Sequence, residues 1–435
     1  MYTLLSRAFD VQPVRRWVEL IRRVRVWCIV VGRHLTAGIA EGIWCWLRHR
    51  GSQSSMANRC TRMLIELGPT FIKGGQLLST RKDLLPSSWC EALGRLHDQV
   101  GPMSVQDTER ALARGYPPIR PWPFERFDWT PVASGSIACV YRARLFDGRD
   151  VAVKLRRPDI EEHMRADLAL LSAGATVIQH LPGMRKVPVR RIVDQVGFAI
   201  LRQLDFEQET DSLIAMRSNL SALRCFRVPQ VIIDASGEGA LVMEFVEGLE
   251  RFSSDELTTE QRREIVRRVL QGVYRMLFID GLVHCDMHPG NLYLNRKIEV
   301  VLLDAGFVIS LSPTVRQLFA QFFLNMSFGR GKECAEVVLR SADHVPDGCD
   351  IEVFRRGVTE LVQANHRRTA EQFRLAPFAA RLFDLQRRSG IMAAPEFIFP
   401  LVSLLVLEGM INEFDAHVDF QAEAIPTLLT ALRVA

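Results

Sequence analysis

The sequence predicts an α+β fold of two lobes, a small β-rich lobe followed by a helical one, and three observations lead to this prediction. Residues 127–157 alternate apolar and polar side chains and turn at Asp147-Gly148, which indicates hairpin strands. A short apolar run, residues 240–248, ends in acids and glycine and suits a hinge between lobes. The region from residue 312 onward has a mostly helical pattern. With 435 residues, 48% hydrophobic and 24% charged, the chain can bury more than one core.

Residues 1–55 are predicted to form a basic amphipathic segment. Residues 1–50 contain nine arginines and three acids, a net of +6, so the rest of the chain nets about −1 of the total of +5. The longest uncharged apolar run here, residues 26–32, is far shorter than the roughly 20 residues that span a bilayer. A helix with arginine on one face suits a lipid interface, and its apolar residues include four tryptophans, Trp17, Trp27, Trp44 and Trp46.

The same N-terminal residues equally allow a helix that packs on the protein with its arginines in solvent. A mitochondrial transit peptide is disfavoured, because the stretch is poor in serine and contains acids. A small polar linker is expected at residues 51–55.

Residues 56–125 are predicted to form a helical extension. Within them, residues 64–86 read LIELGPTFIKGGQLLSTRKDLLP, with a break at Gly68-Pro69 before an apolar, helix-compatible stretch. Lys73 and Gln76 lie in this stretch, and Lys73 is one of only six lysines among 55 basic residues. Taken alone, the stretch is best explained as an ordinary packed helix.

Residues 133–140 read A-S-G-S-I-A-C-V and occupy the frame of the kinase glycine-rich loop, G-x-G-x-x-G-x-V. Two of the glycines are replaced by alanine, which leaves backbone amides to cover phosphates but gives the loop less freedom. The nucleotide-binding positions expected here are Ala133, Ser134, Gly135, Ser136, Ile137, Ala138 and Val140. Lys154 follows Val140 by fourteen positions in Val-Ala-Val-Lys, which matches the strand whose lysine pairs with the α- and β-phosphates.

Residues 160–220 are predicted to be helical, with one break at residues 181–183. The segment LRQLDFEQETDSL supplies three acids as candidate partners for Lys154, namely Asp205, Glu207 and Glu209. Charge runs on helices are usually solvated faces, so the pattern alone does not choose among them.

The apolar run at residues 240–248 is predicted to be a strand, and the backbone groups of Glu244 and Val246 suit the binding of an adenine. Residues 260–280 are predicted to form a long helix. The apolar run at residues 397–407 is too short to span a bilayer and is expected in a core.

Residues 282–306 hold three polar residues whose order and spacing suit phosphoryl transfer, Asp286, Asn291 and Asp304. Asp286 precedes Asn291 by five positions and follows His284 by two, as in the kinase loop H-R-D-x-x-x-x-N. The apolar stretch that follows Asn291 is predicted to form a hairpin that carries Asp304 back toward Asn291. Carboxylate and amide oxygens are the ligands that Mg²⁺ takes, and Asp286 would orient the attacking group.

Taken singly, Asp286, His288 and Asn291 are more simply explained as ordinary loop residues, because Pro289 and Gly290 mark a turn here. The three residues together favour the catalytic interpretation.

With these motifs in hand, the chain resembles the atypical kinase-like UbiB/AarF family, which is linked to ubiquinone biosynthesis. The resemblance covers roughly residues 60–420 by motif match. GPTFIKGGQ resembles the family's KxGQ motif, VASGSIACV its alanine-rich loop and LDFEQE the helix with the αC-type glutamate, and VAVK, HCDMHPGN and LLDAG complete the set. KxGQ together with D-x-H-P-G-N is highly specific.

The resemblance implies a protein-kinase-like fold with extra N-terminal helices over the active site, binding of ATP with Mg²⁺, slow ATPase activity and a role in quinone lipid production. The residues that it implies are catalytic Asp286, Lys154 and Glu209, metal-binding Asn291 and Asp304, and regulatory Lys73, Gln76 and Asp205.

Three positions depart from the family's pattern. Gln203 stands where the ExD motif has its glutamate, which puts the partner arrangement of Lys73 in doubt. Ala305 replaces the DFG phenylalanine, a packing element that sets active geometry. Gly135 stands where the family often has alanine, which loosens the loop toward ordinary kinase behaviour.

The predicted domains are the basic segment 1–55, the helical extension 56–125, a kinase-like N-lobe 126–250 and a helical C-lobe 251–435. Nine cysteines without a C-x-x-C pair favour free thiols in a reducing compartment. We therefore expect a cytoplasmic protein. The basic segment 1–55 leads us to expect that it is peripheral at the inner face of the membrane.

Expected partners are ATP, anionic membrane lipid and quinone-pathway intermediates or enzymes, but not nucleic acid. The expected function is that of a Mg²⁺-ATP-dependent ATPase or small-molecule kinase. An aminoglycoside-kinase-type phosphotransferase has a similar H-x-D-x-x-x-x-N loop, but Lys73 and Gln76 argue against it. A nucleotide-binding pseudokinase scaffold is the other alternative, which Ala305 and Gln203 allow. Mg²⁺-dependent ATP turnover separates an enzyme from a scaffold.

Overall fold

The computed structural model divides the chain into two compact units. The first comprises Met1–Phe206 and Ile232–Val242, and the second comprises Glu207–Val231 and Met243–Ala435. The structure describes residues 13–47, 53–79, 87–94, 96, 101–180, 189–223, 225–251, 257–285, 287, 291–345, 348–366, 375–393, 404, 407–408, 411, 414–415 and 417–434.

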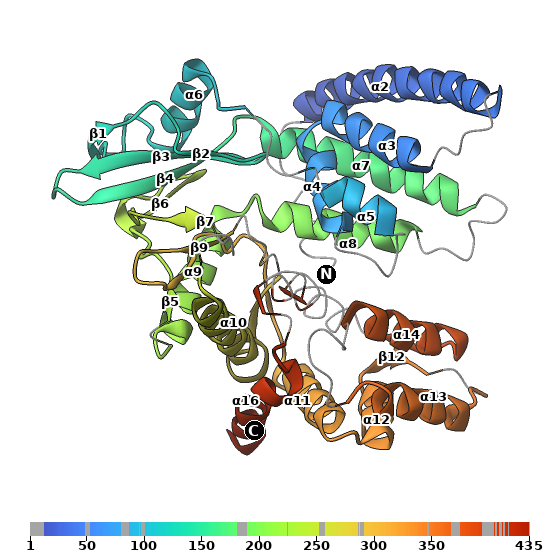
Figure 1. The fold of residues 1–435 in the computed structure, drawn as a ribbon. Helices are drawn as coiled ribbons and strands as arrows, with labels where there is room; N and C mark the ends of the chain where they lie inside the picture. The colour runs from blue at the N-terminus through green and yellow to red at the C-terminus, as the bar shows by residue number, and fades with distance from the viewer. Residues whose placement is uncertain are drawn as a thin grey trace. The chain divides into compact units, whose positions relative to one another are not determined.

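Among the described residues, one part of the first unit is helical (Figure 1). Its helices are α2 (Pro13–Leu47), α3 (Gln53–Leu67), α4 (Pro69–Ser79), α5 (Ser87–Gly94), α7 (Ile160–Gln179) and α8 (Val189–Arg202). Helix α2 packs on α3 and α7, and α8 packs on α4 and α7. The break predicted between α3 and α4 is confirmed: Gly68 has a φ of +104°, which favours glycine, and Pro69 starts the next helix.

A buried ion pair attaches α2 to this unit. Arg23 donates to both carboxylate oxygens of Asp167 on α7, at 2.6 and 2.8 Å, and to the carbonyl of Leu67 at 2.6 Å. Trp27 and Thr70 donate to the same carboxylate at 3.0 and 2.7 Å. Of the two alternatives for the N-terminal segment, the packed helix is thus present. Its arginines are not all in solvent, because Asp167 compensates the buried charge of Arg23.

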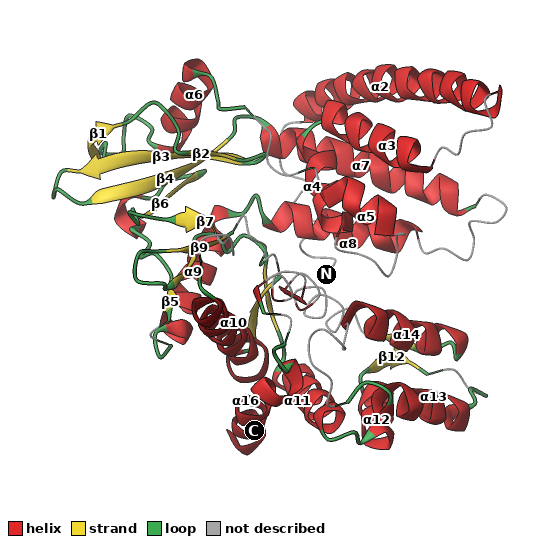
Figure 2. Cartoon of the chain, in the orientation of Figure 1, coloured by secondary structure: helices red, strands yellow, loops and turns green. Residues whose placement is uncertain are grey.

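A five-stranded sheet and α6 (Val105–Gly115) form the other part of this unit (Figure 2). Its strands run β1-β3-β4-β6 with β2 paired to β3, and they are β1 (Phe124–Phe127), β2 (Ala133–Ser134), β3 (Ala138–Leu145), β4 (Asp150–Arg156) and β6 (Ala240–Glu244). The 3₁₀ turn η1 (Ile233–Ala235) precedes β6. Alternate residues of β3 and β4, among them Tyr141 and Val153, are fully buried in the core. The hairpin turn at Asp147-Gly148 is confirmed, with Gly148 at a φ of +84°.

Helices dominate the second unit. They are α9 (Phe206–Leu220, whose first residue belongs to the first unit), α10 (Thr259–Tyr274), α11 (Pro313–Ser327), α12 (Gly331–Arg340), α13 (Ile351–Gln363), α14 (Leu375–Arg388) and α16 (Phe420–Val434). Thr258 and Gln261 form a capping box at the start of α10. The predicted helix at 260–280 is confirmed, except that its last turn is the π-helix η2 (Arg275–Asp280), which ends at Gly281 with a φ of +69°.

Short strands connect the helices of the second unit in three small sheets. The first has the order β5-β10-β9-β7, the second pairs β11 with β8 and the third pairs β12 with β13. Their bounds are β5 (Phe226–Arg227), β7 (Glu250–Arg251), β8 (Leu282–His284), β9 (Leu292–Leu294), β10 (Val300–Leu302), β11 (Val308–Ser310), β12 (Ala342–His344) and β13 (Met392–Ala393).

The predicted α+β fold is confirmed, with local corrections. The linker expected at residues 51–55 is wrong in its second half, because Gln53 already begins α3. The hinge strand stops at Glu244 rather than continuing to residue 248. The predicted break at residues 181–183 lies outside the described residues, whereas the run 160–220 has a further interruption before α9. Leu404 and Leu407 of the run 397–407 are buried, as expected of core. Among the described residues, no helix is long and apolar enough to cross a membrane.

Candidate functional site

The predicted phosphate-covering residues form a tight turn between β2 and β3. Ala133 pairs with Val140 and Ser134 with Cys139, and the amide of Gly135 donates to the carbonyl of Ala138 at 2.9 Å. The side chains of the three residues that follow Gly135 are buried, namely Ser136, Ile137 and Ala138. The structure therefore brings the predicted loop positions together in one compact turn.

Arg157 holds this turn through hydrogen bonds. It was not among the residues predicted from the sequence. Its Nε donates to the carbonyl of Gly135 at 3.0 Å, and its backbone amide donates to the carbonyl of Ile137 at 2.9 Å. Its Nη2 also donates to Ser134 Oγ at 3.0 Å. The only sequence signal was its place just after the predicted lysine strand, in Leu-Arg-Arg-Pro.

Lys154 lies in the middle of the sheet. It is half-buried on β4, where it pairs with Val140 of β3, so it stands directly across from the last residue of the phosphate-covering motif. Its Nζ lies 5.4 Å from the ring centre of Phe206, within the range of a cation–π interaction. Phe206 was also missed, although it belongs to the quoted segment LDFEQE.

Burial distinguishes the three acids that were candidate partners of Lys154. Asp205 and Glu207 are exposed, whereas Glu209 on α9 is only 1% exposed. Burial of a carboxylate is costly unless it is compensated, so Glu209 has the environment of a residue with a specific partner. The pairing of Lys154 with Glu209 stays a prediction.

Of the two hinge residues, Glu244 is the last residue of β6 and Val246 lies two positions beyond it. The carboxylate of Glu244 accepts a hydrogen bond from Arg227 and lies 3.7 Å from Arg217. Its backbone amide donates to the carbonyl of Gln230 at 2.8 Å. Val246 is buried. The Glu244 side chain thus stabilises this part of the second unit, and adenine binding by the backbone at these positions stays a prediction.

The predicted hairpin between Asn291 and Asp304 is present. Strands β9 and β10 are antiparallel, and Leu292 pairs with Leu302, so continuation of this register places Asn291 across from the residue before Asp304. The turn is closed by Asn295, whose Oδ1 accepts from the amides of Lys297 and Glu299 at 2.9 and 3.0 Å. Both expected metal ligands therefore lie at the same end of this hairpin.

A second strand pair joins the Asp304 loop to residues 282–285, which directly precede Asp286 in the sequence. His284 pairs with Val308, and the amide of Cys285 donates to the carbonyl of Phe307 at 2.8 Å. The buried His284 Nε2 lies 2.7 Å from the carbonyl oxygen of Asp304. Since a carbonyl only accepts, Nε2 carries the hydrogen and the imidazole tautomer is fixed. Asp286 and His288 lie outside the described residues.

The carboxylate of Asp304 is half-buried, and its Oδ1 accepts from the amide of Gly306 at 2.8 Å. Asn291 is also half-buried. A carboxylate and an amide side chain give hard oxygen donors of the kind that Mg²⁺ takes, usually with several waters and phosphate oxygens. The donor set therefore fits this metal. Ala305 is 1% exposed and fills part of the core beside the loop.

The predicted regulatory residues lie on α4 and just after α8. Lys73 is half-buried on α4, and Gln76 donates through Nε2 to the carbonyl of Leu96 at 2.7 Å. Asp205 is exposed, while Gln203 is 8% exposed and its Nε2 has no hydrogen-bond partner in the described structure. The association of Lys73 with Asp205 stays a prediction.

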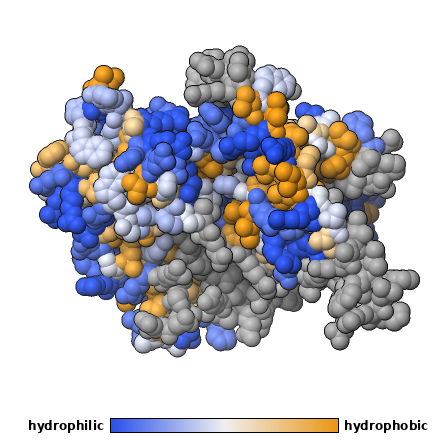
Figure 3. Space-filling model, turned by 90° about the horizontal axis from the view of Figure 1, so that it is seen from above, coloured by the Kyte–Doolittle hydropathy of each residue, from blue (hydrophilic) through white to orange (hydrophobic). Residues whose placement is uncertain are grey.

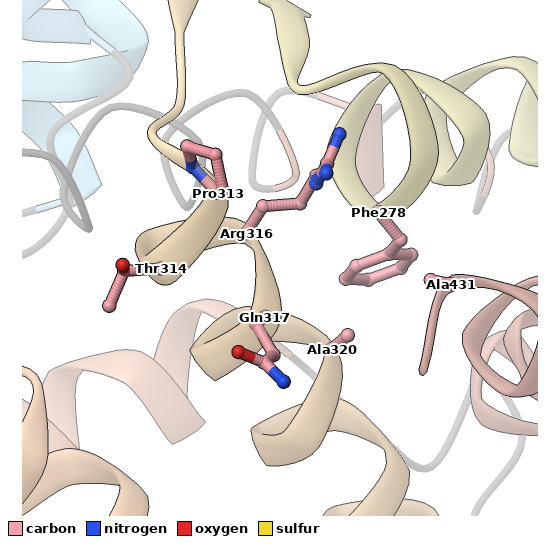
Figure 4. A pocket seen from close by; sticks show the side chains of 7 residues that line it. All are labelled: Phe278, Pro313, Thr314, Arg316, Gln317, Ala320 and Ala431. Carbon is pink, nitrogen blue, oxygen red and sulfur yellow. The ribbon is translucent and has the colours of Figure 1, made fainter. Parts of the chain in front are cut away.

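A surface cavity of about 160 Å³ in the second unit holds none of the predicted residues (Figure 4). It lies among the start of α11, η2 and α16, and Arg316 extends toward the helix that carries Phe278, where it donates to the carbonyl of Ile279. Nearby, burial raises the pKa of Asp280, although Arg275 lies 3.2 Å away. Arg316 thus contacts the backbone of the π-helix η2, and the cavity lies where α11, η2 and α16 pack together.

Comparisons with known proteins show which family the chain is similar to. Residues 95–338 match the ABC1 atypical kinase-like domain. The chain is 28% identical over 395 residues to the probable protein kinase UbiB of Aliivibrio salmonicida (strain LFI1238), which covers 88% of this chain and 72% of that protein. It is 31% identical over 397 residues to the probable protein kinase UbiB of Xylella fastidiosa (strain M12), which covers 88% of this chain and 70% of that protein.

A solved structure is similar in fold. It is described as the complex structure of Rv3197-erythromycin from Mycobacterium tuberculosis, and it superposes with a TM-score of 0.54 at 22% identity. The match covers 80% of this chain and 89% of that chain. At this identity the likeness concerns the fold alone, and it supports the predicted kinase-like architecture.

Proposed function

Because this chain belongs to the ABC1 atypical kinase-like family, with the UbiB proteins, we propose that it binds ATP with Mg²⁺ in support of ubiquinone biosynthesis. It either hydrolyses the nucleotide or transfers the terminal phosphate to a small-molecule or lipid-linked acceptor. The observation that carries the proposal is the joining of two loops by His284 and the pair of strands β8 and β11. One of the two joined segments ends at Cys285, directly before the expected base Asp286 in the sequence, and the other contains the expected metal ligand, Asp304.

The proposed roles follow from the chemistry of the residues. Asn291 and Asp304 would hold Mg²⁺, which neutralises phosphate charge when it is bound. Lys154 orients the α- and β-phosphates, with Glu209 as its partner, and the backbone of residues 133–140 covers the phosphates. Asp286 orients the attacking water or hydroxyl group.

Turnover of ATP with and without Mg²⁺ tests this proposal. We expect slow, Mg²⁺-dependent release of phosphate, which is lost when Asp286 is replaced by asparagine. Nucleotide binding with no turnover at any Mg²⁺ concentration would instead identify a pseudokinase scaffold. Quinone profiling by mass spectrometry in a deletion strain tests the pathway, and an unchanged quinone profile would contradict it.

Lys73 is proposed to help occlude the site from protein substrates, as the resemblance to the family implies. We expect the wild-type chain to hydrolyse ATP without phosphorylating added proteins, and Lys73→Ala to permit autophosphorylation. Radiolabelled ATP assays on both forms measure this. Lys332→Ala, which removes a lysine from the first turn of α12, is the matched control. Robust phosphorylation of generic proteins by the wild type would contradict the occlusion and, with it, the small-molecule or lipid-linked acceptor.

We propose anionic membrane lipid as a further partner, through the exposed face of α2. One apolar stripe of this helix is exposed at i, i+4, i+7 and i+11 spacing, formed by Trp17, Ile21, Val24 and Cys28. The exposed Arg22 and Arg25 accompany it, while Glu19, an acid on the same part of the helix, is mostly buried. Apolar side chains lie among hydrophilic ones on the face seen in Figure 3.

Vesicle co-sedimentation tests the lipid proposal. Deletion of the whole segment is unsuitable, because it removes Arg23 and with it the buried ion pair to Asp167 that attaches α2 to the rest of the unit. We expect a Trp17→Ala, Ile21→Ala double variant to lose most binding to anionic vesicles at low salt, and wild-type binding to fall as salt rises. Met56→Ala, which changes an exposed apolar residue of α3, is the control. Failure of the wild type to co-sediment at low salt would overturn the proposal.

A further inference from the structure

Arg157 contacts the phosphate-covering turn at three of its residues. It donates to the carbonyl of Gly135 through Nε and to the carbonyl of Ile137 through its backbone amide, at 3.0 and 2.9 Å. Its Nη2 donates to Ser134 Oγ at 3.0 Å and to the carbonyl of Gly101 at 2.7 Å. Ser134 Oγ in turn donates to the same Gly101 carbonyl at 3.0 Å. The turn is therefore connected both to the end of β4 and to the segment that leads into α6.

The guanidinium of Arg157 joins backbone segments rather than pairing with a carboxylate among the described residues. In the described part of the chain, its hydrogen bonds all go to carbonyl and hydroxyl oxygens. Three neighbouring arginines that line the same cavity of about 130 Å³ are instead paired with carboxylates. These pairs are Arg110 with Asp107 and Asp159, Arg114 with Glu238, and Arg156 with Glu161. A guanidinium offers several donors in one rigid plane, which suits the joining of separate backbone segments.

This arrangement changes what nucleotide binding costs. Ordering a flexible backbone segment costs conformational entropy. A flexible glycine-rich loop incurs that cost when the nucleotide binds, whereas a loop that is already held in place does not. Gly135 is the residue that would give the turn its freedom, and its carbonyl is the oxygen that Arg157 Nε holds.

We propose that Arg157 is a positioning residue that holds residues 133–138 in their nucleotide-covering conformation before the nucleotide binds. The proposal rests on the proposed function in one respect, that the ligand covered is a nucleotide. The turn then already has its nucleotide-covering conformation in the free protein, whereas a flexible loop acquires it only on binding. Arg157 acts through the backbone of Gly135 and Ile137 and has no catalytic role of its own.

Hydrogen exchange of the full-length protein without nucleotide tests the positioning role directly. In Arg157→Ala, we expect amides in the peptide that covers residues 133–139 to exchange about tenfold faster than in the wild type, since the side-chain hydrogen bonds to Gly135, Ser134 and Gly101 are lost. Arg157→Lys keeps the charge but not the planar fork, so we expect an intermediate rate. Arg149→Ala, which removes an exposed arginine from the β3–β4 turn, should leave this peptide unchanged.

Nucleotide affinity gives the second readout. We expect Arg157→Ala to raise the Kd for Mg²⁺-ATP about tenfold, with the far-ultraviolet circular dichroism unchanged, and millimolar guanidinium to restore part of the affinity. If Arg157→Ala does not fold, Ser134→Ala removes the hydroxyl that links Arg157 to Gly101 and should speed the same exchange by a smaller factor.

The two readouts separate this inference from the proposed function. Wild-type protein that binds no nucleotide would remove the proposed function, while the exchange experiment would still decide whether Arg157 holds the turn. Unchanged exchange of the 133–139 peptide in a folded Arg157→Ala protein overturns the inference, whatever the protein binds. Faster exchange with unchanged nucleotide affinity overturns the part that concerns the nucleotide.

Discussion

The two loops expected to hold the phosphates and the metal are fastened in different ways. In the first unit, the turn at residues 133–138 is held from outside by Arg157. In the second unit, the loop at Asp304 is held partly by Asp304 itself, through the bond from the Gly306 amide to its Oδ1, and partly by His284.

This difference has a practical consequence for experiments. The groups expected to bind phosphate in the first loop are backbone amides, whereas the side chain that holds the loop belongs to Arg157. Arg157 can therefore be replaced without removing a group that is expected to bind phosphate. In the second loop the expected metal ligand is also a structural hydrogen-bond acceptor, so its loss mixes binding with local stability. Substitutions that keep one role and remove the other are needed there.

Asp304→Asn should have the largest effect, because it separates the two roles of this residue. The amide oxygen of asparagine still accepts from Gly306, so we expect the fold to persist, whereas the negative charge that attracts Mg²⁺ is gone. Thermal-shift titration with ATP and Mg²⁺ should show no Mg²⁺-dependent stabilisation. Asn291→Ala should weaken the response less. An Asp304→Asn protein with the wild-type shift would remove Asp304 from the metal site and end the contrast drawn between the two loops.

His284→Phe should have an intermediate effect on the second loop. The ring volume is kept, but the carbonyl of the half-buried Asp304 loses the donor that the buried His284 supplies, which costs about 1–3 kcal/mol. Urea unfolding should show this loss, together with weaker Mg²⁺-ATP binding. His366→Phe is the matched control, since the half-buried His366 also contacts a carbonyl, that of Gln363, in the turn after α13. Equal destabilisation by both substitutions would mean that His284 has no special part in holding this loop.

Gly135→Ala should have the smallest effect, because the first loop is already held from outside. An added Cβ would approach the carbonyl oxygen of Ala138 to 3.4 Å, an ordinary contact, and Gly135 does not have a positive φ. We expect the free energy of unfolding to change by less than about 0.5 kcal/mol and nucleotide affinity by less than about twofold. Gly148→Ala, at a φ of +84°, should destabilise by more. A large change in Gly135→Ala would show that this turn depends on glycine for its shape.

Much of the fold and of the candidate site was predictable from the sequence because the signals are local. The alternation in residues 127–157 and the Asp147-Gly148 turn predicted the β3–β4 hairpin, and the turn after Asn291 predicted how Asp304 returns. The motif spacings selected Lys154, Asn291 and Asp304 before any geometry was known. Periodicity, turn chemistry and motif spacing all act over a few residues, so a sequence displays them directly.

The tertiary structure alone decided which side chains hold those motifs in place. Arg157 and Gly135 are 22 residues apart, His284 and Asp304 are 20 apart, and Arg23 and Asp167 are 144 apart. In the sequence, Arg23 is one of nine arginines in residues 1–50, and nothing nearby marks it as buried. Whether a polar group is buried, and which partner compensates it, depends on elements that only the folded chain brings together. The cost of desolvating an uncompensated polar group then fixes the pairing.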